Sequence, residues 1–181
     1  SQDEGHTFII AIMRDLTEKI TAARELELLR HQQERILNTV SEGIFGLDQE
    51  NHVTFVNPAA LAMLGYEPHD LAALGNKLHE IVHYHKPDGR AYPLTDCPIH
   101  ATSQDGIVRK GTETFWRKNG ESFPVRYTAT PIQEDYEITG TVVTFADITE
   151  RKKMEQKLRE SAMTDELTSL FNRRGFMTLA D

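Results

Sequence analysis

The chain has 181 residues, and its 28 acidic and 20 basic side chains give a formal net charge of −8. Nucleic-acid phosphates need clustered Lys and Arg, so no nucleic-acid partner is expected. The longest apolar run, Phe8–Met13, is far shorter than the roughly 20 residues that span a bilayer, and no signal peptide is evident. The single cysteine, Cys97, excludes an intramolecular disulfide and suits a reducing compartment. We therefore expect a cytoplasmic domain, even where the rest of the protein is anchored in a membrane.

The first feature along the chain is a short internal repeat. Residues 7–18 and 139–150 are both apolar, β-branched runs that end in Asp-(Leu/Ile)-Thr-Glu. The repeat predicts that residues 1–15 hold the last strand of a preceding, truncated unit. Without the rest of that unit, the strand over 8–13 is expected to be disordered or to join the sheet edge of a neighbour.

The segment 16–40 is predicted to be a linker helix, because it contains neither Gly nor Pro. Its seam repeats at spacings of three and four, with one polar member: Ala22, Leu26, Leu29, Gln33, Ile36 and Val40. A two-stranded coil between two copies is favoured over one amphipathic helix packed on its own domain. A shorter, charged output helix is predicted over 149–163.

The globular part is predicted over 41–148. Strands are expected at 43–48, 52–56, 112–118, 121–132 and 139–146, with Asn119-Gly120 as a hairpin turn. Asn57 and Pro58 open a helix that ends at Gly65, and short helices follow near 68–74, 76–84 and 97–104. This order predicts an α+β fold with one five-stranded antiparallel sheet and small helices on one face.

Histidines gather in the middle of the chain, around the cysteine. His79 and His83 are four residues apart, and Cys97 and His100 are three apart, so each pair can share a helix face. Imidazole and thiolate suit zinc, so His79, His83, Cys97 and His100 are candidate metal ligands. Two alternatives stay open: surface histidines with an inert thiol, or a redox-active Cys97 whose pKa is lowered at a helix start.

Residues 36–150 resemble a PAS sensor domain. The matching pieces are Ser41-Glu42-Gly43-Ile44, Val56-Asn57-Pro58-Ala59-Ala60, Leu64-Gly65-Tyr66, Arg117-Lys118-Asn119-Gly120 and Asp147-Ile148-Thr149-Glu150-Arg151. The resemblance implies a small-molecule pocket and a sensory role. The cofactor stays open between haem, flavin, zinc and none. The resemblance makes His79, His83 and His85 candidate haem ligands. A flavin needs aromatic contacts, so Trp116 is a candidate flavin contact, with plain packing as the alternative. The resemblance also implies that Asp147 and Thr149 couple the sheet to the output helix.

Residues 164–181 resemble the opening of a GGDEF domain, which in complete form is a diguanylate cyclase. The matching positions are Asp165, Leu167, Thr168, Asn172, Arg173 and Arg174. This resemblance implies a parent protein that joins two GTP into cyclic di-GMP with Mg²⁺. The fragment lacks the catalytic carboxylates and signature loop of that family, so it is not expected to be an enzyme. We expect a homodimer through the linker helices. A spacer domain without cofactor and a histidine-kinase output remain the alternatives.

Overall fold

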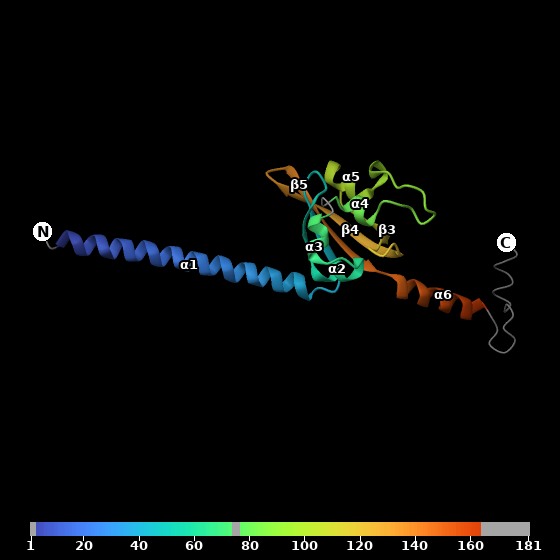
Figure 1. Cartoon of the computed structure of the whole chain (residues 1–181), viewed down its shortest axis with the longest axis horizontal. Helices are drawn as coiled ribbons and strands as arrows, with labels where there is room; N and C mark the ends of the chain where they lie inside the picture. The colour runs from blue at the N-terminus through green and yellow to red at the C-terminus, as the bar shows by residue number, and fades with distance from the viewer. Residues whose placement is uncertain (1–2, 74–76, 164–181) are drawn as a thin grey trace. The chain divides into compact units, whose positions relative to one another are not determined.

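A computed structural model describes residues 3–73 and 77–163 and divides the chain into two compact units after Ser41. The first unit is one long helix, α1 (Asp3–Thr39). The second unit holds the sheet and the remaining helices, labelled in Figure 1. In chain order its elements are β1 (Gly43–Leu47), β2 (Val53–Val56), α2 (Pro58–Leu64), α3 (Pro68–Ala73), α4 (Leu78–Val82), the 3-10 turn η1 (Leu94–Asp96), α5 (Pro98–Asp105), β3 (Arg109–Trp116), β4 (Ser122–Glu134), β5 (Glu137–Asp147) and α6 (Thr149–Met163).

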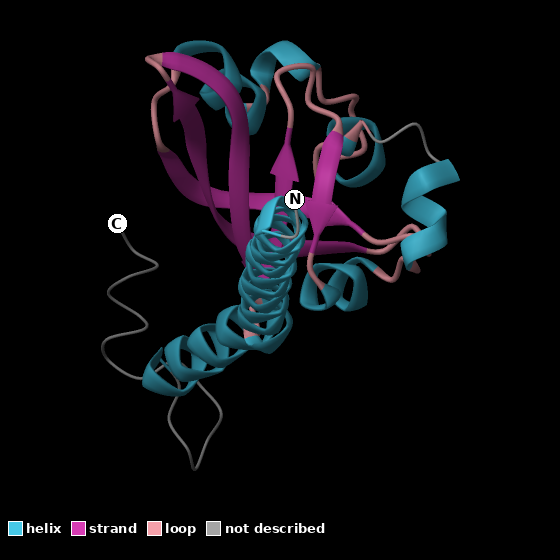
Figure 2. Ribbon diagram, turned by 90° about the vertical axis from the view of Figure 1, so that its left-hand side faces the viewer, coloured by secondary structure: helices cyan, strands magenta, loops and turns pink. Residues whose placement is uncertain are grey.

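The five strands form one antiparallel sheet in the order β2-β1-β5-β4-β3. The sheet curves strongly, as Figure 2 shows. The predicted α+β class and five-stranded sheet are therefore confirmed. The first and last strands of the domain lie side by side at its centre, so the exit toward α6 starts from the middle of the sheet.

The core lies between the sheet and the short helices. Along β4, Phe123, Val125, Tyr127 and Ala129 are buried in strict alternation, as their period of two predicts. Three aromatic rings fill the centre, with ring centroids 5.2–6.5 Å apart: Phe45, Phe115 and Phe145. Side chains from the helices close the same cluster from the other side, including Leu64, Ile81, Val82 and Ile99.

Local signals explain where the elements begin and end. The Asn57 side chain accepts a hydrogen bond from the backbone N–H of Ala60, and Pro58 occupies the first turn of α2. Gly65 ends α2 in a left-handed conformation, at φ 73°. Gly120 adopts φ 83° in the turn between β3 and β4, as the Asn-Gly pair predicts. The predicted start and stop of α2 and the position of the hairpin turn are thus confirmed. The strands on either side of the turn end at Trp116 and begin at Ser122, rather than at the predicted 118 and 121.

The strand predicted over residues 8–13 is wrong: these residues lie within α1. A strand must pair with neighbours to satisfy its backbone N–H and C=O groups, whereas a helix pairs them within itself. Residues 3–39 contain no proline, so nothing interrupts the helix. The predicted helices over 16–40 and 149–163 are confirmed as helices.

The GGDEF-like positions, Asp165 to Arg174, lie outside the described residues. Among the helices that are described, none has a stretch both long and apolar enough to cross a membrane.

Candidate functional site

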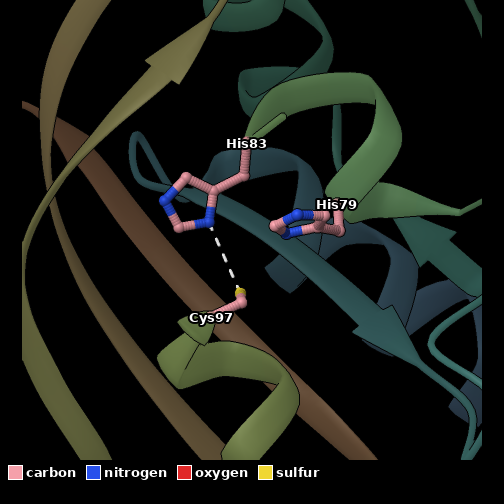
Figure 3. A group of neighbouring side chains, drawn as sticks. All are labelled: His79, His83 and Cys97. Carbon is pink, nitrogen blue, oxygen red and sulfur yellow. Dashed lines mark hydrogen bonds between the residues drawn. The ribbon is translucent and has the colours of Figure 1, made fainter. Parts of the chain in front are cut away.

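Three of the predicted ligands converge in the interior. His79 lies in the first turn of α4 and His83 directly follows its last residue. Cys97 immediately precedes α5 and faces the two imidazoles (Figure 3). One ligand atom from each of the three lies within 4.8 Å of the others. The Nδ1 atom of His83 is 3.4 Å from the Sγ atom of Cys97. Both side chains are almost fully buried, at 1% and 2% exposure.

The Nε2 atom of each imidazole contacts another part of the protein. The Nε2 atom of His79 donates to the backbone carbonyl of Tyr92 at 2.7 Å. The Nε2 atom of His83 lies 3.2 Å from a carboxylate oxygen of Glu113, whose other oxygen accepts from the Tyr92 hydroxyl at 3.4 Å. These contacts fix both rings, so their Nδ1 sides are left for the interior.

The cluster is strongly polarised. Burial alone raises the pKa of the Cys97 thiol, but the neighbouring imidazoles of His79 and His83 outweigh it and lower this pKa to about 6. Burial disfavours the cationic form of His83, but Cys97 and Glu113 outweigh it and raise the His83 pKa to about 9. Each of the two groups therefore favours the charged form of the other.

A small cavity adjoins the cluster, lined also by Asn51, Leu78 and His100. Its volume is about 10 Å³, which is close to the space that one water molecule needs. Sites for drug-sized ligands and cofactors are usually about 300–1,000 Å³. The cavity in this structure thus has no room for haem or flavin, whereas one water molecule fits.

The structure does not bring the other predicted residues into the cluster. The ring of His85 packs against Tyr84 and Trp116, with centroids 4.8 and 6.2 Å away. The Trp116 indole N–H donates to the His85 carbonyl at 2.9 Å, so Trp116 fastens the loop by packing and hydrogen bonding. His100 lines the cavity, but its Nδ1 atom is 2.8 Å from the side-chain amide nitrogen of Asn51.

Two residues of the site were missed by sequence reasoning, namely Tyr92 and Glu113. Tyr92 lies in a loop, where no periodicity indicates its direction. A signal for Glu113 did exist, because it stands two residues before the buried Phe115 on β3 and so shares its face of the strand. A carboxylate on the core face needs a partner, and His83 provides it.

A second group of side-chain contacts lies where β5 ends. We call its residues the output junction: Arg117, Asp147 and Thr149. Arg117 forms an ion pair with Asp147 at 2.7 Å, and Asp147 also accepts from the backbone N–H of Thr149 at 2.8 Å. Arg117 further contacts the backbone carbonyl of Met63 at the end of α2. Asp147, rather than Thr149, supplies this side-chain acceptor at the start of α6. The junction joins the β3–β4 hairpin, α2 and the output helix.

Comparison with known proteins gives relatives in signalling. Over 173 residues the chain is 31% identical to the probable diguanylate cyclase DgcE of Escherichia coli (strain K12), covering 93% of this chain and 15% of that protein. Over 142 residues it is 22% identical to the signal transduction histidine-protein kinase AtoS of the same organism, covering 77% of this chain and 21% of that one. The chain thus spans about one fifth or less of these relatives.

The fold has solved counterparts. The PAS domain of an HTR-like protein from Haloarcula marismortui matches with a TM-score of 0.56 and 18% identity, covering 71% of this chain and 98% of that domain. The family model for the PAS domain matches residues 41–150, which include the whole sheet, the His/Cys cluster and the output junction. The chain therefore belongs to the PAS domain family, whose members are sensor domains in signal transduction.

Proposed function

We propose that this PAS domain controls a diguanylate cyclase by moving the helices that flank it. The observation that carries the proposal is the output junction, which ties the sheet and α2 to the first turn of α6 by side-chain contacts. A shift in the core that moves the β3–β4 hairpin would move Arg117 and, through Asp147, the start of the helix. This gives two states whose populations a ligand can bias.

The cyclase output is supported by two similarities. One is the relative that is 31% identical over 93% of the chain and described as a probable diguanylate cyclase. The other is the GGDEF-like run of residues 164–176 in the sequence after α6. Since GTP would be the substrate of that output, we place the domain in the cytoplasm. A histidine kinase is the second candidate, favoured by the similarity to AtoS.

The proposal also requires a dimer, because joining two GTP needs two cyclase domains to meet. The predicted seam of α1 includes Leu26, Leu29 and Ile36, which are 69%, 58% and 57% exposed in the single chain. On α6, Met154 and Leu158 are 70% and 72% exposed. We propose that a second copy of this chain covers both apolar stripes in parallel coiled coils.

The output is tested in cells that produce the full-length protein containing this chain. We expect Asp147→Ala to change cyclic di-GMP levels at equal protein abundance. Arg126→Ala is the matched control, because Arg126 pairs with Glu42 at 3.4 Å, outside the junction. Cyclic di-GMP levels that do not depend on the protein, together with phosphorylation of a histidine in it, would instead establish the kinase output.

The dimer is tested by disulfide crosslinking in a Cys97→Ser background. Cysteines introduced as Leu29→Cys or Ile36→Cys, on the proposed seam, should crosslink two copies. Arg30→Cys, on a neighbouring face of the same helix, should crosslink poorly. Equal crosslinking at all three positions, or none, would count against the parallel coil.

A further inference from the structure

The imidazoles of His79 and His83 share a feature that a signalling relay does not need. Each imidazole uses its Nε2 atom toward the protein, one to the Tyr92 carbonyl and one to Glu113. Metal-binding histidines usually donate their second nitrogen to a carbonyl or carboxylate, which fixes the ring and its tautomer. Both forms of this support occur here, one on each ring.

A buried atom without a hydrogen-bond partner also supports a metal site. The Nδ1 atom of His79 is buried and has no hydrogen-bond partner among the described residues. Because its Nε2 atom donates to a carbonyl, the Nδ1 atom carries the lone pair. A buried acceptor without a partner destabilises the fold. A cation held between this atom, His83 and Cys97 would satisfy it.

The distances are close to those of a tetrahedral zinc site. Zn–N bonds of about 2.05 Å and Zn–S bonds of about 2.3 Å place neighbouring nitrogen and sulfur ligands about 3.6 Å apart. The observed separation between His83 Nδ1 and Cys97 Sγ is 3.4 Å. One ligand atom from each of the three residues lies within 4.8 Å of the other two, so shifts of about 1 Å complete the site.

We propose that His79, His83 and Cys97 bind one divalent transition-metal ion, of which Zn²⁺ is the best match. Two imidazoles and one thiolate leave the fourth position open, as in catalytic and ligand-binding zinc centres. The adjoining cavity of about 10 Å³ accommodates one water or a similarly small ligand there. This inference does not depend on the proposed cyclase output; it concerns what the sensor core binds.

Charge supports the assignment. A doubly charged ion with one thiolate carries a net charge of +1. The carboxylate of Glu113, which contacts the Nε2 atom of His83, compensates this charge. With a metal at Nδ1, the neutral His83 ring would donate from Nε2 to Glu113. Cysteine coordinates a metal as the thiolate.

His100 is not assigned to the metal, because the Asn51 amide occupies its Nδ1 atom. The second cluster of candidate ligands, Asp48, Glu50 and His52, lies at the β1–β2 turn and is partly or fully exposed. Its histidine is already paired with Asp48 at 3.2 Å, and it serves here as a control site.

The test uses the full chain, stripped with a chelator and titrated with Co²⁺ and Zn²⁺. We expect one ion per chain and, with Co²⁺, a thiolate-to-metal charge-transfer band that disappears in Cys97→Ser. Loss of a residue that only supports a metal ligand typically weakens metal binding about 10–100-fold. His79→Gln and His83→Gln remove the ligands themselves, so each should weaken binding about 100-fold or more. The control His52→Gln should bind like the wild-type chain, and His100→Gln should still bind one ion per chain because His100 is not a ligand.

Folding is checked separately, since a ligand variant can lose its structure. Circular dichroism of each metal-free variant reports the fold, and Zn²⁺ should raise the melting temperature of the wild-type chain but not of Cys97→Ser. A folded wild-type chain that binds no ion stoichiometrically would overturn the proposal, and so would a charge-transfer band that persists in Cys97→Ser. Loss of binding in His100→Gln would overturn the three-residue ligand set.

Discussion

Asn57 connects the first strand to the first helix of the domain, and its replacement gives a quantitative test of the fold. Its Oδ1 atom accepts from the backbone N–H of Ile44 at 2.8 Å and of Ala60 at 3.0 Å. Its Nδ2 atom donates to the backbone carbonyl of Glu42 at 3.0 Å, and the side chain is only 2% exposed. Asn57→Ala removes all three bonds at once.

The cost follows from these contacts. Loss of an N-cap costs about 1 kcal/mol. The Ile44 N–H and the Glu42 carbonyl are part-buried, and each left without a partner costs about 1 kcal/mol or slightly more, toward the low end for unsatisfied groups. We therefore expect Asn57→Ala to lower the free energy of unfolding by about 3–4 kcal/mol. For a domain of this size that corresponds to a fall of about 15 °C in melting temperature.

Urea unfolding monitored by circular dichroism measures this loss, and two variants control it. Asn57→Ser keeps a cap acceptor but is too short to reach Ile44, so it should recover about 1 kcal/mol. Asn119→Ala removes an exposed turn contact, the 3.0 Å bond from the Glu121 N–H, and should cost less than about 1 kcal/mol. If Asn57→Ala costs no more than Asn119→Ala, the contacts assigned to Asn57 do not stabilise the fold.

Three further predictions concern the junction, the sheet and the loop. Burial raises the pKa of Asp147, but hydrogen bonds and the ion pair outweigh it and hold this pKa below its usual value; its contribution to stability is therefore present above about pH 4 and is lost as the pH falls through the folded-state pKa. Urea unfolding at pH 7 and pH 3 should show wild type more stable than Asp147→Asn at pH 7, and a gap that stays constant would contradict this. Gly140→Ala places a methyl group against the backbone carbonyl of Leu47, which cannot retreat, so it should lower the free energy of unfolding by about 2–3 kcal/mol; an unchanged urea midpoint would speak against the β1–β5 register. Trp116→Phe keeps an aromatic ring but removes the bond to the His85 carbonyl, and we expect a loss of about 1 kcal/mol with faster amide exchange in the 85–97 loop, whereas unaltered exchange would argue that the indole does not fasten it.

Local signals in the sequence were sufficient for most of the fold. Asn57, Gly65 and Gly120 punctuate the chain through backbone preferences that do not depend on distant residues. The buried alternation along β4 follows in the same way from its period of two. The strand prediction for residues 8–13 was wrong because β-branched residues form a strand only where neighbouring strands are present. The composition of a segment does not show whether such strands are there.

The candidate site was predictable only in part. Spacing placed His79 and His83 on one face of a helix, and they do lie together. It could not show that His85 would turn toward Trp116 or that Asn51 would occupy His100, because both depend on contacts across the fold. The same long-range packing brings Cys97 to the two histidines.

We expect occupancy of the core to change the dynamics of the output helix, and amide hydrogen exchange of the full chain tests this most directly. Zn²⁺-loaded and chelator-treated wild-type protein would be compared segment by segment. Exchange should be slower around α4 and η1 in the loaded chain and altered over residues 147–153, where the output junction meets α6. Identical exchange over 147–153 in the two samples would contradict this expectation.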